Sequence, residues 1–184
     1  KSREGTVVDA DDMVDEMIAT AKRHTEELGK VKDFKPDELE ALCKTIGMGA
    51  MKFYLLRVDP KKKMIFNPEE SIDFHGFTGP FVQYTYARIK SILRKELLHS
   101  NDLPPTQLLP LEKEILVALE QFNTILIQAA KELNPSVIAI YIFTLAKSFN
   151  SFYTVHSSAN AETEEKKQLR LQLAVMTSNV LKKG

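Results

Sequence analysis

The sequence predicts an all-α protein, a bundle of about six helices with one irregular segment, a loop or short strand, near residues 60–80. Apolar residues recur at helical spacing through most of the chain. Only 7 glycines and 8 prolines occur in 184 residues, and several of them cluster between residues 60 and 80. With 43% hydrophobic residues the chain can bury a sizeable core, and no apolar run approaches the roughly 20 residues of a membrane span.

A first helix is predicted at residues 11–28. Asp9 or Asp11 would cap its start, and Gly29 is a plausible stop. A second helix opens at Pro36, where a proline suits the first turn. Its apolar face consists of Leu39, Leu42, Cys43, Ile46, Ala50, Phe53 and Tyr54.

Small residues in the second helix indicate close packing. Gly47 and Gly49 weaken the helix locally, and this loss of propensity suits a close approach of another backbone. Cys43 is the single cysteine, so no internal disulfide forms, and we expect a buried thiol in a reducing compartment.

The helical period breaks at residues 61–80, which read as a loop with at most one small strand at 63–66. Four helices follow, at residues 81–98, 111–133, 136–153 and 163–182. Asn134 and Pro135 predict a stop and restart between two of them, as an N-cap followed by a first-turn proline.

The helix at 81–98 has two different faces on a wheel of 100° per residue. The expected core stripe is Val82, Tyr86, Ile89, Leu93 and Leu97, and the opposite face holds Phe81, Tyr84, Arg88, Ser91 and Lys95. Aromatic rings beside cations suit unpaired nucleotides, because bases stack on the rings while cations meet phosphates. The alternative is that a neighbouring helix or loop covers the two rings.

A second aromatic group lies at the end of the helix at 136–153. Phe149 reads as core, whereas Tyr153 and His156 at the helix exit can meet a base or remain solvated. The run Lys61, Lys62 and Lys63 attracts phosphate or is only a solvated tip.

No self-contained active site is visible. The sequence lacks the GxxxxGK, HExxH, CxxC and GxSxG patterns, and no residue is predicted to be catalytic. The four histidines are far apart, so no metal site is expected. Lys plus Arg (25) balances Asp plus Glu (25), and therefore any RNA contact must be local, where the basic excess at residues 61–100 lies.

Residues 74–89, FHGFTGPFVQYTYARI, closely resemble the G-x-T-G-P-[YF]-x-Q-Y-x-x-A/S-R signature of class I arginyl-tRNA synthetases. That signature opens the anticodon-binding domain of the family. Residues 145–153, LAKSFNSFY, with the later LRL of 169–171, are similar to two motifs near the family's C-terminus. The start, KSREGTVV, looks like the tail of the family's KMSKS-type loop.

The resemblance implies an all-α anticodon-binding bundle of the DALR type at residues 76–184, with a truncated C-terminus. It further implies connecting helices that contact the tRNA stem at 6–75 and a catalytic-loop remnant at 1–5. Lys1, Ser2 and Arg3 would belong to the loop that clamps ATP. The implied tRNA-binding residues are Phe81, Tyr84, Arg88, Arg94, Lys95, Phe152, Tyr153 and His156.

The implied partner is a tRNA for arginine, with no DNA and no membrane, in a cytoplasmic monomer. Because the chain starts at Lys1 and lacks the HIGH motif, we expect a fragment without its catalytic domain. The parent enzyme would use ATP with Mg²⁺, whereas the fragment would bind tRNA weakly and not aminoacylate. The alternative is a free-standing helical protein–protein interaction domain that shares ancestry with synthetases.

Overall fold

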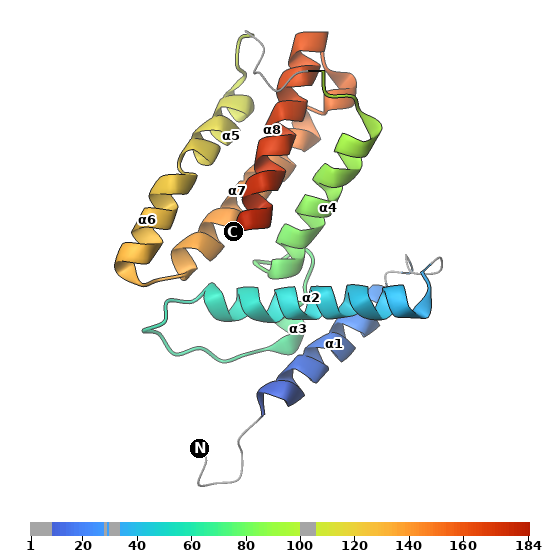
Figure 1. The fold of residues 1–184 in the computed structure, drawn as a ribbon, viewed down its shortest axis with the longest axis vertical. Helices are drawn as coiled ribbons and strands as arrows, with labels where there is room; N and C mark the ends of the chain where they lie inside the picture. Colours follow the sequence, from blue (N-terminus) through green and yellow to red (C-terminus); the bar gives the residue numbers. More distant parts are fainter. Residues whose placement is uncertain (1–8, 28, 30–33, 100–105) are drawn as a thin grey trace. The chain divides into compact units, whose positions relative to one another are not determined.

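The computed structural model describes residues 9–27, 29, 34–99 and 106–184, which form helices joined by loops (Figure 1). These residues contain no β-strand, in agreement with the predicted all-α class. The chain divides into two compact units, Lys1–Val58 with Lys62–Phe81 and Asp59–Lys61 with Val82–Gly184. The α-helices are α1 (Ala10–Glu27), α2 (Pro36–Leu56), α3 (Pro68–Ser71), α4 (Gly79–Lys95), α5 (Pro110–Glu120), α6 (Phe122–Glu132), α7 (Ser136–Val155) and α8 (Glu164–Lys183).

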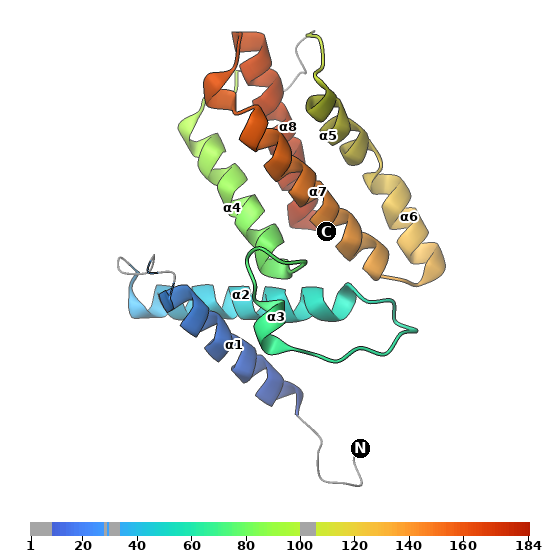
Figure 2. The same ribbon diagram turned by 180° about the vertical axis from the view of Figure 1, so that it is seen from behind.

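The first unit is built on α1 crossing α2, with α3 against both (Figures 1 and 2). Its core is made of Met17, Ala21, Cys43, Ile46, Ala50 and Ile72. Burial raises the pKa of the Cys43 thiol, as expected for a core cysteine. A Cβ at Gly47 would lie 2.9 Å from the Met17 carbonyl oxygen, so the predicted close packing of α2 is confirmed.

Local signals set the ends of α1 and α2. The Asp9 carboxylate accepts a hydrogen bond from the Asp11 N–H at 3.3 Å, as predicted for a capping residue. After α1 the chain turns at Gly29, whose φ of 67° favours glycine. Pro36 opens α2, and the buried face includes Cys43 and Phe53, as predicted.

The predicted irregular segment is present between α2 and α4, and residues 63–66, where at most one small strand was expected, form a loop. Within the described residues no second strand is available to pair with it. Instead the Tyr54 hydroxyl donates a hydrogen bond to the Ile65 carbonyl at 3.1 Å. The short helix α3 follows, capped by Asn67.

In the second unit α7 packs against α5, α6 and α8 (Figure 2). The single helix predicted at 111–133 is wrong, because the chain is interrupted at Gln121 and forms α5 and α6. The Tyr141 hydroxyl of α7 donates to the Ala118 carbonyl at 2.7 Å, and the Tyr141 ring stacks on Phe122 at 5.9 Å. Residues on both sides of the interruption therefore contact α7.

Helix α4 begins two residues before its predicted start. The Phe81 N–H donates to Thr78 Oγ1 at 3.3 Å, so Thr78 caps the helix. A Cβ at Gly79 would overlap the Gly49 carbonyl oxygen and lie 3.0 Å from Phe53 Cβ, which explains a glycine at this position. Thr78 and Gly79 of the signature thus have a structural role.

The buried face of α4 differs from the predicted core stripe. Val82 and Ile89 are buried as predicted, but Tyr86 and Leu93 are only half-buried. Leu97 lies beyond the end of the helix and is 77% exposed. The fully packed positions are Val82, Thr85, Ile89 and Ile92, which shifts the core toward the Thr85 side of the helix.

Candidate nucleic-acid interface

A groove of about 300 Å³ lies in the second unit between α4 and the end of α7. It combines two cations, a hydroxyl group, an apolar side chain, a carboxylate and an aromatic ring. The lining residues are Arg88, Ser91, Ile92, Lys95, Glu96 and Tyr153. This mixture of ring and cations suits an unpaired nucleotide, which offers a base to stack and a phosphate to neutralise.

The side chains of Arg88 and Tyr84 contact each other on α4. The Arg88 guanidinium carbon lies 4.9 Å from the centre of the Tyr84 ring, within the range of a cation–π contact. Arg88 Nη2 also donates to the Tyr84 hydroxyl at 3.2 Å. Tyr84 remains 45% exposed, so its ring keeps surface that a base can reach.

The Tyr153 ring packs on the ring of Phe149, which lies one turn earlier in α7. The two ring centroids lie 6.1 Å apart, and the ring planes are only 9° from parallel. Phe149 is fully buried. Tyr153 therefore presents a rigid ring at the groove, which lowers the entropic cost of stacking a ligand.

The groove carries a local positive charge. Arg94 and Lys95 end α4, where cations also complement the helix dipole. The one carboxylate in the lining, Glu96, forms an ion pair with Lys167 at 2.7 Å and raises the pKa of that lysine. With Glu96 paired, the charges of Arg88 and Lys95 are left to attract a phosphate.

The turn after α7 is held by Arg170 of α8, which is 2% exposed. Its Nη1 donates to the Ser157 carbonyl at 3.1 Å, and its Nη2 pairs with Glu162 at 2.7 Å. His156 ends α7 directly before Ser157 and is half-buried. Arg170, part of the LRL motif, thus positions the exit of α7 rather than facing the groove.

The structure brings together three predicted site residues, Arg88, Lys95 and Tyr153, with Tyr84 in contact with the first of them. Arg94 is exposed beside the groove but does not line it. Phe152 is 1% exposed and contacts Phe149 and His156, so it supports the site from the core. Phe81 is half-buried in the first unit, His156 does not line the groove, and Lys1, Ser2 and Arg3 lie outside the described residues.

Sequence reasoning missed Asn150, Ile92 and Glu96. Asn150 accepts a hydrogen bond from Arg88 Nη1 at 2.6 Å. It lies inside the LAKSFNSFY motif, next to the buried Phe149, and a hydrogen-bonding amide beside a core position is the signal that the sequence offers for it. Ile92 and Glu96 line the groove because α4 is rotated relative to the predicted stripe.

Other candidate features carry less chemistry. Lys61 lines a second groove of about 420 Å³ with Lys131, but Asp59 and Glu132 in the same lining balance these charges. Where the chain is described, no cluster of three or more His, Cys, Asp or Glu side chains suits a metal ion. Nor does any described helix have the length and apolar character needed to cross a membrane.

Comparison with known proteins gives a family match and a set of similar sequences. The model of the DALR anticodon binding domain matches residues 82–184, which include the whole groove. The chain is 50% identical over 182 residues to an arginine–tRNA ligase of Flavobacterium psychrophilum, covering 99% of this chain and 30% of that protein. An arginine–tRNA ligase of Parabacteroides distasonis is 44% identical over 191 residues, with 100% and 32% covered. The chain therefore spans just under a third of the length of these relatives.

Two solved structures are also similar to this chain. The arginyl-tRNA synthetase of Thermus thermophilus superposes with a TM-score of 0.86 at 31% identity, over 95% of this chain and 30% of that one. That of Plasmodium falciparum gives 0.80 at 22% identity, over 96% and 31%, which shows the fold alone.

Proposed function

The chain belongs to the DALR anticodon binding domain family, and from this premise we propose that it binds the anticodon loop of a tRNA for arginine. The observation that carries the proposal is the groove in which Arg88, Lys95 and Tyr153 meet. Anticodon bases are unpaired and can be splayed out of the loop, so a protein can stack them on rings and read their edges. A double helix hides its bases from such a site.

Each side chain has a role in this proposal. Tyr153 offers a ring backed by Phe149, and a base stacked on it gains about 1–3 kcal/mol. Arg88 has N–H groups beyond those given to Tyr84 and Asn150, and these can meet the edge of a base. Lys95, a point charge on a flexible stem, suits a phosphate.

We assign the remaining predicted residues to the surroundings of this site. Arg94 adds charge for the backbone of the loop, and Phe152 supports the rings of α7 from within. His156 and Phe81 would meet nucleotides outside the groove. The region at residues 6–75 would contact the stem of the tRNA, as the resemblance implies.

For the whole protein we propose the activity named for the relatives, the joining of arginine to its tRNA with ATP and Mg²⁺. Lys1, Ser2 and Arg3 would contribute to the ATP loop, and the described residues supply no step of the reaction. We expect a monomer that acts in the cytoplasm. The balanced overall charge supports weak binding by this chain, with affinity shared with the rest of the protein.

The test is a titration of this chain, at low salt, with a tRNA for arginine and with the same tRNA altered only in its anticodon. Preferential binding of the unaltered tRNA, reduced in Tyr84→Ala, is the expected result. Ile127→Ala is the control, because Ile127 is exposed on α6 and does not line the groove. Equal affinity for the two tRNAs would remove the claim of anticodon recognition. Binding to neither would favour the interaction-domain alternative.

A further inference from the structure

Asn150 of α7 joins two residues of α4 through its side-chain amide. Its Oδ1 accepts from Arg88 Nη1 at 2.6 Å, and its Nδ2 donates to Thr85 Oγ1 at 2.7 Å. Thr85 is fully buried, whereas Asn150 and Arg88 are half-buried, and of these only Arg88 lines the groove. The amide thus connects the packed face of α4 to its groove face.

The chemistry of the partners determines which way this amide faces. A guanidinium only donates hydrogen bonds, so the amide oxygen must face Arg88. The amide nitrogen then faces the Thr85 hydroxyl, which accepts. A flip of the amide would turn its NH₂ group toward the guanidinium, and two donors would then face each other, so the bond to Arg88 depends on this orientation.

Arg88 is consequently held at two points. One terminal nitrogen donates to Asn150 and the other to the Tyr84 hydroxyl at 3.2 Å, while the guanidinium lies over the Tyr84 ring. A long side chain held in this way has little rotamer freedom left to lose when a ligand binds. The planar guanidinium is also kept in one plane, which matters for bonds to a base edge.

We infer that Asn150 is a positioning residue that presents the Arg88 guanidinium to an unpaired base in the groove. This inference rests on the proposed function, since it concerns how that same site selects its ligand. Asn150 itself does not line the groove, and its effect passes through Arg88. The orientation of Arg88 then contributes to the preference for one base over another.

A purely structural role for Asn150, as a polar link between α4 and α7, makes different predictions. It would lower the stability of the fold and weaken binding of every tRNA alike, with or without Arg88. A positioning role weakens binding only while Arg88 is present, and it weakens the preferred tRNA most. A double-mutant cycle separates the two.

The experiment measures the affinity of this chain for a tRNA for arginine and for its anticodon-altered form. The variants are Asn150→Ala, Arg88→Ala and the double variant, with Ser151→Ala as a control at an exposed neighbouring position of α7. Thermal unfolding of each variant is recorded in parallel. Thr85→Val preserves the side-chain shape but removes the hydroxyl that accepts the hydrogen bond from Asn150 Nδ2. It replaces Asn150→Ala if that variant does not fold.

We expect Asn150→Ala to weaken binding of the unaltered tRNA about fivefold, the effect of losing one pre-ordered side chain. In the Arg88→Ala background the same change should alter affinity by less than about twofold. Preference for the unaltered tRNA should fall with Asn150→Ala, and Ser151→Ala should leave it unchanged.

The two proposals fail in different ways. If Arg88→Ala leaves affinity for both tRNAs unchanged, the proposed function of the groove is wrong. If Arg88→Ala weakens binding but Asn150→Ala, or Thr85→Val in its place, does not, the groove stands and the positioning role is wrong. Equal effects of Asn150→Ala with and without Arg88 would also overturn the positioning role.

Discussion

The Glu112 carboxylate of α5 is fully buried and accepts a hydrogen bond from Arg170 Nε of α8 at 3.2 Å. Lys166 Nζ meets the same carboxylate at 2.6 Å, and the Leu109 N–H donates to it at 2.8 Å. Arg170 also holds the Ser157 carbonyl at the turn after α7. One buried carboxylate therefore joins α5 and α8 and, through Arg170, the turn that follows Tyr153 and His156.

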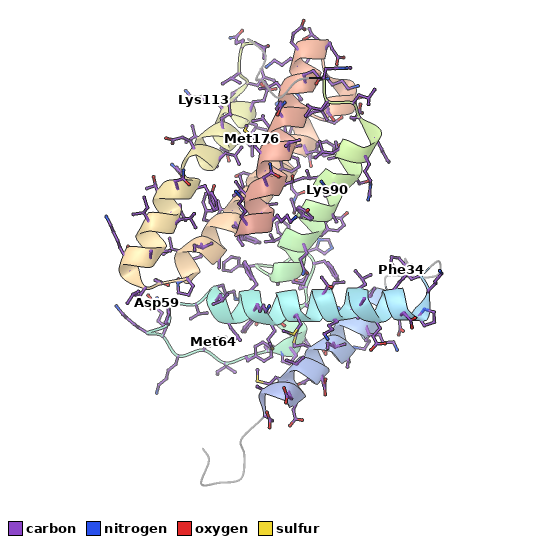
Figure 3. The ribbon with its side chains drawn as sticks, viewed as in Figure 1. Phe34, Asp59, Met64, Lys90, Lys113 and Met176 are labelled. Carbon is purple, nitrogen blue, oxygen red and sulfur yellow. The ribbon has the colours of Figure 1, made fainter. Side chains whose placement is uncertain are left out.

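Removal of the buried carboxylate should cost much more stability than removal of an exposed charge. In Glu112→Ala the guanidinium of Arg170 loses a buried partner, and we expect a loss of about 3–5 kcal/mol in the free energy of unfolding. The matched control is Lys113→Ala, at the exposed neighbouring position labelled in Figure 3, with a change within about 0.5 kcal/mol. Urea denaturation measures both, and similar midpoints for the two variants would contradict this role.

The same carboxylate should make stability fall in acid. Burial acts to raise the pKa of Glu112, but hydrogen bonds from Leu109, Lys166 and Arg170 outweigh it and lower the pKa below its ordinary value. A lowered folded-state pKa gives a contribution that is complete above the unfolded value of about 4.3 and is lost as pH falls through the folded value.

We therefore expect the urea midpoint of the unchanged protein to drop between pH 6 and roughly pH 3, below the unfolded-state pKa of Glu112. Glu112→Gln, which cannot titrate at this position, should lose less of its midpoint over the same range. An identical pH dependence in the two proteins would show that other carboxylates govern the acid transition.

Substitution of Gly79 should destabilise the first unit although alanine is the better helix former. Elsewhere in a helix, glycine to alanine usually stabilises by about 0.4–1 kcal/mol. Here the new methyl would overlap the Gly49 carbonyl, and we expect Gly79→Ala to cost about 1–3 kcal/mol instead. Thermal unfolding shows whether Gly79→Ala lowers or raises the stability. Ala87→Ser, at an exposed position of α4, is the comparison. A stabilised Gly79→Ala would mean that the two backbones do not approach closely.

Lys95 should account for part of the salt dependence of tRNA binding. A lysine that neutralises one phosphate contributes roughly 0.7–0.9 to the slope of log affinity against log salt. We expect Lys95→Ala to lower the slope by about that amount and to weaken both tRNAs alike, because a phosphate contact carries no sequence information. Lys90→Ala, a lysine of the same helix labelled in Figure 3 that does not line the groove, should leave the slope unchanged. Equal slopes for Lys95→Ala and the unchanged protein would contradict a phosphate contact at Lys95.

Much of the fold follows from local patterns. The capping aspartate of α1, the proline that opens α2 and the Asn134–Pro135 restart all lie where the sequence predicts. These signals are local because a capping side chain satisfies N–H groups only two or three residues away. The family resemblance also came from local sequence, since the signature at residues 74–89 is long. Within it, Thr78 caps α4 and Gly79 allows a close approach to the Gly49 carbonyl.

Predictions that depended on neighbouring elements were weaker. The wheel for α4 placed Leu97 in the core, but the helix ends at Lys95 and turns its Thr85 side inward. Periodicity gives the width of an apolar face but not the direction from which other helices cover it. The break at Gln121 was missed for the same reason, since the helical pattern continues through it and the contacts of Tyr141 belong to another helix.

By itself the sequence determined the all-α class, most helix boundaries and the family, and it predicted two aromatic groups, one of them beside cations, as RNA contacts. Only the tertiary structure decided that Arg88, Lys95 and Tyr153 share one groove, that Phe152 lies beneath it, and that Asn150 holds Arg88 across 62 positions of sequence. The physical reason is that helix formation and capping depend on neighbours along the chain. A binding groove depends on how the buried faces of separate helices pack together, and that packing is a property of the whole second unit.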